Sequence, residues 1–204
     1  MNVFSKNVFI NCPFDSDYYP LLRPLIYTLL CNGFNPRIAI ENSDSGKLRA
    51  DKLVELIKDS KFSIHDLSRL QSSKKNEIFR LNMPFELGID YGARRFSKQL
   101  ADKKFLILEK ERYKYMQALS DINGFDIKAH NGSAYGVVKA VRDWLVETAK
   151  LKKVDSPTKI WNEYNKCYAS IYDEKIEANF TANEIDFMPI PELIDEIMER
   201  LPHN

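Results

Sequence analysis

The sequence predicts an α/β fold with a parallel β-sheet, and two observations support this prediction. Short apolar runs rich in β-branched and aromatic residues alternate along the chain with longer segments whose apolar residues recur at helical spacing. Strands that alternate with helices in this way form a parallel sheet with helices on both faces. With 204 residues, 44% of them hydrophobic and 29% charged, the chain is long enough for one such domain and an appendage.

Five short segments are predicted to form the strands, because each is apolar and is bounded by turn residues. They are residues 8–10, 36–41, 62–66, 104–108 and 125–129. The fourth run is continuous and apolar, as strands buried in a parallel sheet are. Four helices are predicted between and after these strands, over residues 18–31, around 53–57, from about 84, and over 135–150.

The chain is predicted to change character after residue 150. Residues 1–150 are expected to form the α/β domain, and residues 151–204 a helical C-terminal extension. The segment 152–157 has the composition of a linker, and two helices are predicted beyond it, over about 158–179 and 191–201.

Composition and charge exclude several classes of function. The formal net charge is +1, which gives no electrostatic reason to expect nucleic acid or an anionic membrane as a partner. No apolar stretch approaches the length of a membrane span. The three cysteines are odd in number and far apart, which is neither a disulfide framework nor a metal-site spacing. We therefore expect a cytoplasmic protein without a bound metal.

Polar residues gather where the predicted strands end. Asn11 and Asp15 follow the first strand, Ser45 follows the second, and His65 and Asp66 end the third. In open parallel sheets, ligands bind outside the carboxyl ends of the strands. Amides and carboxylates at this edge are suited to bind a ribose or a base. The alternative is that asparagine, aspartate and serine are simply good turn and cap residues.

The most informative stretch is residues 82–93, which begins a predicted helix near Pro84. Phe85 and Ile89 lie four residues apart and are expected to face the core. Glu86 and Asp90 also lie four apart and share another face. A partly buried glutamate near a second carboxylate holds its proton more tightly and can act as acid, base or nucleophile. The alternative is an ordinary acidic helix face paired with the arginines at 94–95.

Three other motifs give little indication of a functional site. The run Ser45-Gly46-Lys47 lacks the preceding glycine of a phosphate-binding loop, so we reject that interpretation. His65 and His130 have no second metal ligand at a useful spacing. The charged run 109–112 is expected to be a solvated strand exit.

Two separated motifs resemble a known superfamily. The third strand ends in His65-Asp66-Leu67, and Asn82 precedes Glu86-Leu87-Gly88 by four residues. This pattern resembles the signature of nucleoside 2-deoxyribosyltransferase-like proteins, in which an aspartate ends a strand and an Asn-x-x-x-Glu-Leu-Gly segment opens a helix. It is also similar to TIR-like domains, which use a helix-borne glutamate. Together with the run at 9–15, these motifs resemble a bacterial group within this superfamily.

The resemblance covers residues 8–150 and implies both a fold and a chemistry. It implies a flavodoxin-like three-layer sandwich with a five-stranded parallel sheet, to which the C-terminal helices are added. It makes Glu86 the nucleophile or the carboxylate that stabilises an oxocarbenium ion, and Asp66 the group that holds the ribose or assists proton transfer. The residues expected to contact the substrate are Asn11, Asp15, Ser45, His65, Asn82 and Asp90.

Three functions remain open from the sequence. The first is an enzyme that cleaves or transfers at the N-glycosidic bond of a nucleotide, with NAD or another nucleotide as substrate and no cofactor. The resemblance suggests that such an enzyme is an antiphage defence or stress effector. The second is a module that binds a nucleotide signal without turnover, and the third is a protein-interaction module. A homo-oligomer is expected, and the basic segment between Asp66 and Asn82 departs from the family pattern.

Overall fold

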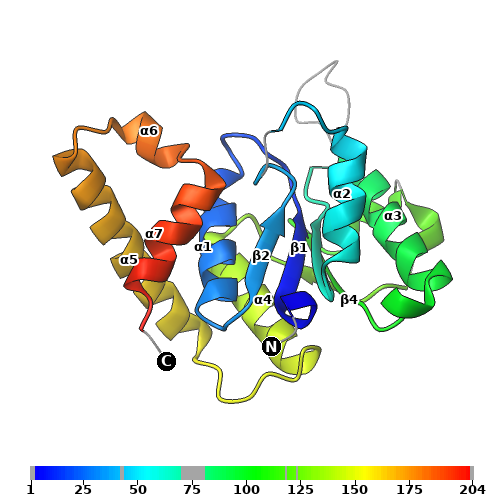
Figure 1. Ribbon diagram of the computed structural model, residues 1–204. Coiled ribbons are helices and arrows are strands. Elements are labelled where there is room, and N and C mark those ends of the chain that lie inside the picture. The colour runs from blue at the N-terminus through cyan, green and yellow to red at the C-terminus, as the bar shows by residue number, and fades with distance from the viewer. Residues whose placement is uncertain (1–2, 42–43, 70–80, 118, 123, 203–204) are drawn as a thin grey trace. The chain divides into compact units, whose positions relative to one another are not determined.

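The computed structural model describes residues 3–41, 44–69, 81–117, 119–122 and 124–202 (Figure 1). The basic segment between Asp66 and Asn82 therefore lies largely outside the described residues. The strands are β1 (Asn7–Asn11), β2 (Asn35–Ile38), β3 (Phe62–Asp66), β4 (Lys104–Glu109) and β5 (Ile127–Ala129). The α-helices are α1 (Tyr19–Leu30), α2 (Arg49–Lys58), α3 (Asn82–Phe96), α4 (Ala134–Glu147), α5 (Pro157–Glu177), α6 (Ala182–Asp186) and α7 (Ile190–Arg200).

The five strands form one sheet in the order β2-β1-β3-β4-β5, and every pair is parallel. This is the flavodoxin-like strand order, so the predicted α/β fold class is confirmed. Asn11 at the end of β1 lies beside His65, and Asp66 at the end of β3 lies beside Leu108. This register brings the carboxyl ends of β1, β3 and β4 to one edge of the sheet.

Two predicted strands are shorter than expected, and α3 is longer. The second strand ends at Ile38 because the chain turns there: the amide of Glu41 donates to the carbonyl of Ile38 at 2.9 Å, and the Glu41 carboxylate pairs with Arg37 at 2.7 Å. The fifth strand begins at Ile127 instead of 125. Helix α3 has 15 residues, although only a short helix was expected.

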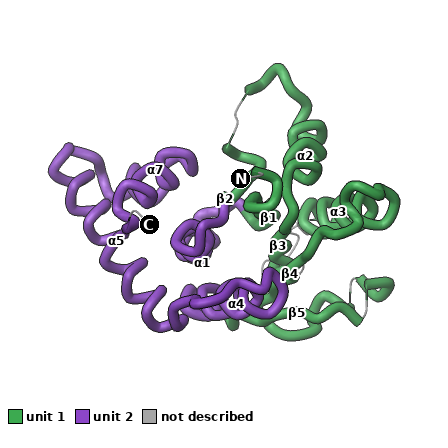
Figure 2. Tube along the Cα trace, turned by 60° about the horizontal axis from the view of Figure 1, so that its bottom comes forward, with its two compact units in different colours: residues 1–13, 35–132 green, residues 14–34, 133–204 purple. Residues whose placement is uncertain are grey.

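The chain divides into two compact units (Figure 2). Unit 1 comprises residues 1–13 and 35–132, and unit 2 comprises residues 14–34 and 133–204. This division differs from the predicted boundary at residue 150, because α1 and α4 group with the C-terminal helices. The physical reason is that α5 and α7 pack against α1, and α5 also packs against α4.

In unit 1, helices α2 and α3 cover the same face of the sheet. One apolar cluster joins Phe9 of β1 to α2, with Ile89 and Ala93 of α3 packed against it. A second cluster joins Met83 and Leu87 of α3 to residues that follow or belong to β3, β4 and β5: Leu67, Ile107, Tyr115 and Ile127. Helix α3 is therefore held along its length by the sheet and by α2.

In unit 2, a row of aromatic rings holds α5 in place. Tyr164 of α5 meets Tyr27 of α1 edge-on at 5.7 Å and stacks with Tyr168 at 6.0 Å. The guanidinium of Arg23 lies 4.7 Å from the Tyr168 ring and pairs with Asp186 at 2.8 Å. Contacts between a cation and an aromatic face add to the stability that ring burial provides.

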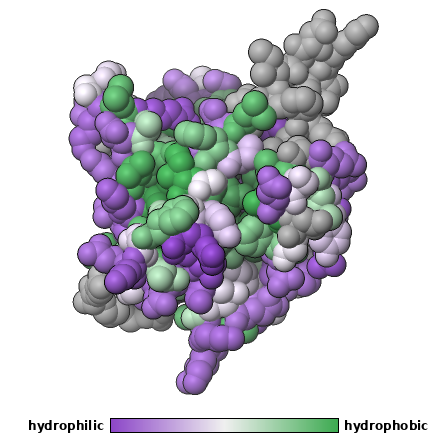
Figure 3. Space-filling model, turned by 90° about the vertical axis from the view of Figure 1, so that its right-hand side faces the viewer, coloured by the Kyte–Doolittle hydropathy of each residue, from purple (hydrophilic) through white to green (hydrophobic). Residues whose placement is uncertain are grey.

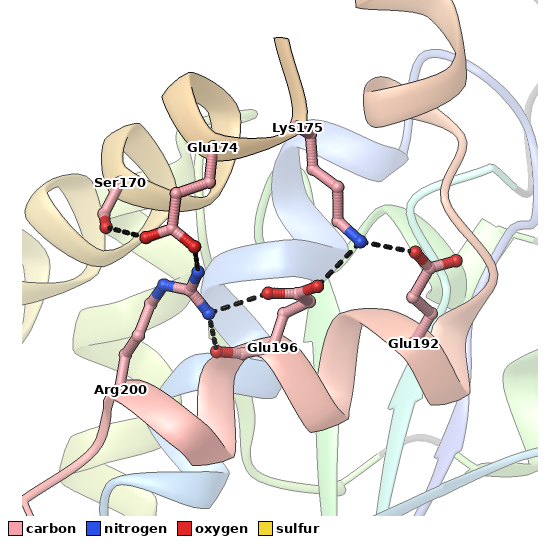
Figure 4. A network of polar contacts seen from close by, with 6 residues as sticks. All are labelled: Ser170, Glu174, Lys175, Glu192, Glu196 and Arg200. Atoms are coloured by element: carbon pink, nitrogen blue, oxygen red, sulfur yellow. Dashed lines mark hydrogen bonds and ion pairs between the residues drawn. The ribbon is translucent and has the colours of Figure 1, made fainter. Parts of the chain in front are cut away.

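A polar network joins α5 to α7 (Figure 4). The ammonium of Lys175 lies 2.7 Å from the carboxylates of both Glu192 and Glu196. Arg200 contacts Glu196 at 2.7 Å and also pairs with Glu174, whose carboxylate accepts a hydrogen bond from Ser170 at 3.1 Å. A shared network of this kind fixes the register of two helices more firmly than isolated surface pairs do.

Candidate functional site

Helix α3 turns Glu86 toward the interior of unit 1. Its buried residues are Met83, Glu86, Leu87 and Asp90, which follow helical spacing along one face. The prediction that Phe85 faces the core is wrong, since its side chain is 64% exposed. Met83 and Leu87 fill the apolar contacts with the sheet instead. Because Met83 and Leu87 face the sheet, the neighbouring carboxylates of Glu86 and Asp90 are also buried.

Glu86 is a mostly buried residue, and its carboxyl oxygens are not among the fully enclosed, unpartnered polar atoms of the described residues. The residue is only 6% exposed, and no hydrogen bond to it is made by the part of the chain that the structure describes. Burial raises the pKa of Glu86 to about 6, against the opposing influence of the positive charge of Arg49. A carboxyl group in this state is mostly ionised at neutral pH and is poised to exchange a proton just below it.

One turn further along α3, Asp90 ends a chain of buried polar groups that crosses to the sheet. The Asn11 amide donates to the carbonyl of Met83 at 2.8 Å and to Nδ1 of His65 at 3.0 Å. Since Nδ1 accepts, the imidazole proton is on Nε2, which lies 3.2 Å from Asp90 Oδ2. Asn11, His65 and Asp90 are fully buried. These hydrogen bonds hold the first turn of α3, which leads into Glu86, against the sheet.

Lys103 contacts the second carboxylate oxygen of Asp90 and so extends this series of buried polar groups. The sequence pattern gave no reason to expect a lysine there. Its ammonium lies 3.1 Å from Asp90 Oδ1 and donates to the carbonyls of Ile57 and Ser60 at 2.7 and 2.6 Å. Burial would raise the pKa of Asp90, but the hydrogen bond from His65 and the charge of Lys103 lower it below its ordinary value. Burial lowers the pKa of Lys103, although Asp90 opposes that shift.

Asp66 belongs to a different polar group. Successive strand residues point to opposite faces of a sheet, so Asp66 projects away from the face that His65 shares with α3. Its Oδ1 accepts the amide of Ser68 at 2.8 Å, and its Oδ2 lies 3.3 Å from Nε2 of His130. The structure therefore brings Asn11, His65 and Asp90 together against α3, the helix that carries Glu86, and holds Asp66 in other contacts.

The contacts of His130 argue against a serine nucleophile. Its Nε2 lies 2.7 Å from the Ser68 hydroxyl, which together with Asp66 gives the residue types of a catalytic triad. However, Nδ1 accepts a hydrogen bond from the amide of Gly132 at 3.1 Å, so the proton of a neutral imidazole is on Nε2. A base that carries its proton on the side of the serine cannot remove one from it.

Replacing Ser68 by alanine tests this conclusion. We expect any nucleotide turnover by the protein to change by less than about threefold, because the hydroxyl then contributes one hydrogen bond and no covalent step. The measurement is the steady-state rate of product release for the variant and the wild type. A loss of about a thousandfold would mean that the serine is a nucleophile after all.

Glu109 is a second buried carboxyl group, and the prediction that it lies in a solvated strand exit is wrong. The residue is only 2% exposed. Its Oε1 accepts the amide of Tyr115 at 2.6 Å. Burial, with a smaller contribution from the charge of Asp66, raises its pKa despite the hydrogen bonds it accepts from backbone amides. Glu109 is the last residue of β4, as Asp66 is of β3, and this place at a strand end was the signal in the sequence that could have indicated its burial.

The remaining predicted residues lie elsewhere. Ser45 is exposed in the loop before α2, and Asn82 is exposed at the first residue of α3. Asp15 belongs to unit 2, where its carbonyl accepts the amide of Tyr18 at 2.9 Å. Among the described residues, no cluster of three or more histidine, cysteine, aspartate or glutamate side chains is arranged to hold a metal ion. None of the helices in the described ranges is long and apolar enough to cross a membrane.

The fold and these buried groups define an α/β protein of flavodoxin-like strand order, with ionisable side chains between α3 and the strand ends. Comparison with protein-family models, with curated proteins and with solved structures gave no match.

Proposed function

We propose that the protein cleaves or transfers at the N-glycosidic bond of a nucleotide, NAD included, with Glu86 as the catalytic carboxylate. The observation that supports this proposal is the state of Glu86: buried, without a hydrogen-bond donor among the described residues, and with its pKa raised to about 6. A glutamate whose pKa is raised by burial and that has no hydrogen-bond donor among the described residues is a functional candidate.

The chemistry suits a carboxylate in these surroundings. As the bond between the sugar and the base breaks, its electron pair leaves with the base, and positive charge grows on the anomeric carbon and ring oxygen. A negative charge in a low-dielectric site stabilises that charge more strongly than it would in water. Glu86 would either stabilise the oxocarbenium ion while water attacks, or form a transient bond to the sugar that a second acceptor then breaks.

Two further groups are assigned roles in this proposal. The Oδ1 of Asn11 is buried and accepts no hydrogen bond from the described residues, so it would accept one from a sugar hydroxyl only where ligand binding parts the groups that enclose it. Asp66 would hold the ribose or assist proton transfer to the leaving base. A nucleotide as ligand and a cytoplasmic setting belong to the same proposal, as does a role in antiphage defence or stress.

One observation favours a second candidate, a module that binds a nucleotide signal without turnover. Asp66 projects to the opposite face of the sheet from the one that α3 covers, and it is engaged with Ser68 and His130. If the two carboxylates do not act on one sugar, the polar strand ends still provide acceptors for a ribose and a base.

The experiment that separates these candidates uses purified protein, NAD and a panel of nucleotides. Chromatography of the mixture is expected to show a free base or nicotinamide that accumulates with time and enzyme concentration. Calorimetry on the same panel reports binding. Binding without any product would establish the signal-binding module and overturn the enzymatic proposal.

A further inference from the structure

The outer face of α3 carries an apolar stripe along its whole length. The stripe consists of Leu81, just before the helix, and then Phe85, Gly88, Gly92 and Phe96, which fall on one side at spacings of three and four residues. Leu81, Phe85 and Phe96 are 61%, 64% and 92% exposed. Figure 3 views the molecule from the side on which α3 lies in Figure 1, and it shows apolar side chains gathered on this face.

The centre of the stripe has no side chains. A Cβ atom added to Gly88 would meet nothing within 4 Å, and one added to Gly92 would meet only the Phe96 ring at 3.9 Å. Both glycines have ordinary helical backbone, since neither has a positive φ. In a helix interior, glycine is less stable than alanine. Neither crowding within the chain nor backbone geometry therefore explains these two glycines, whereas close approach of another helix would.

The stripe is also complementary to itself. Gly88 and Gly92 lie equally far on either side of position 90, and Phe85 and Phe96 lie almost equally far beyond them. When two copies of α3 cross antiparallel at this position, Gly88 of one copy meets Gly92 of the other. Each Phe85 then lies near Arg95 and Phe96 of the second copy. A two-fold interface requires this arrangement, in which one patch is complementary to itself.

We propose that the occupant of this face is a second copy of the chain, docked through α3 about a two-fold axis. Complete coverage of Phe85, Phe96 and Leu81 would remove about 800 Å² of surface in the two copies, before polar residues around them are counted. That approaches the roughly 1,000 Å² that a specific interface needs. On one copy the three side chains supply about half of that area, which is the size of the largest apolar patch on a typical monomer, and such a patch is often functional. The exposed Arg95 would lie over the second copy's Phe85 ring as a cation on an aromatic face.

Sedimentation velocity of the full chain, with Gly88→Leu and Phe85→Glu variants, tests the interface. The wild type is expected to sediment as a dimer at micromolar concentration. Each variant is expected to weaken dimerisation about 100-fold or more, because every substitution occurs twice in the interface. Ile176→Glu, which places the same charge on an exposed apolar residue of α5, serves as the control and is expected to remain dimeric.

Gly88→Ala separates this effect from misfolding. Alanine favours the helix and meets no neighbour in the monomer, so the variant is expected to have a higher melting temperature at low protein concentration. In the dimer, its methyl group separates the two helices and weakens association. A wild type that stays monomeric at high concentration overturns the proposal, as does full dimerisation by both Gly88→Leu and Phe85→Glu.

Discussion

Glu86→Gln is expected to reduce the rate of base release about 1000-fold and, at the same time, to stabilise the protein at pH 7. The amide has nearly the shape of the carboxylate but cannot oppose positive charge on the sugar. The gain in stability arises because the wild type must keep a buried carboxylate ionised. Raising a pKa from 4.5 to about 6 corresponds to about 2 kcal/mol of unfolding free energy at most.

The sign of the pH dependence follows from the raised pKa. The native state binds the Glu86 proton more tightly than the unfolded state does, so the unfolding free energy falls as the pH rises from 4.5 to about 6. The stability difference between Glu86→Gln and the wild type should therefore be full above pH 6 and disappear below pH 4.5. The value of kcat/KM for the wild type should decline as the pH falls below about 6, because the active form is ionised.

Urea denaturation at several pH values and chromatographic rate assays measure the two effects. The control is Glu177→Gln, since Glu177 is exposed on α5, and neither its stability nor its activity should differ from the wild type. A Glu86→Gln enzyme with unchanged turnover would remove the catalytic role. The stability difference between Glu86→Gln and the wild type is expected to be larger at neutral pH than in acid. If it is the same at both, Glu86 does not have the raised pKa that burial gives it.

The fold class could be predicted because the relevant signals are local. Short apolar strands, their turn residues and the helical spacing between them lie within single segments of the sequence. The polar strand ends follow from the fold, since parallel strands bring their carboxyl ends to one edge. This rule predicts that Asn11 and His65 lie close together, and their side chains are in contact at 3.0 Å.

The orientation of α3 could not be predicted in the same way. Met83 with Leu87, and Phe85 with Ile89, are both apolar pairs four residues apart. Spacing alone does not decide between two adjacent faces of a helix. The choice depends on partners distant in sequence, Leu67 and the residues of β4 and β5.

Lys103 is the clearest example of a residue that only the fold reveals. It stands in the run Asp102-Lys103-Lys104, where β4 begins, and lysine is almost never fully buried. Its partners come from other parts of the chain, the end of α2 and the middle of α3. Nothing in its own neighbourhood distinguishes it from Lys104, which is exposed.

Asp90→Ala is expected to be the most destabilising single change in unit 1, lowering the unfolding free energy by about 3–5 kcal/mol. It leaves the buried ammonium of Lys103 with backbone carbonyls alone and removes the acceptor from His65. A loss of this size lowers the melting temperature of a chain this long by about 10 °C. Lys166→Ala, which removes an exposed pair with Glu163, should change stability by less than about 1 kcal/mol.

The buried ion pair of Asp90 and Lys103 also allows the cost of an unpaired buried charge to be measured separately from the strength of the ion pair. In the double variant Asp90→Leu with Lys103→Met, no charge remains to be buried, so most of the loss seen in Asp90→Ala should be recovered. The pKa of Asp90 is lowered, so its stabilising contribution is present at neutral pH and is lost as the pH falls through that lowered value. The gap between the wild type and Asp90→Ala should accordingly narrow in acid. A double variant as unstable as Asp90→Ala, with a gap independent of pH, would mean that packing around Asp90, and not its charge, holds α3 on the sheet.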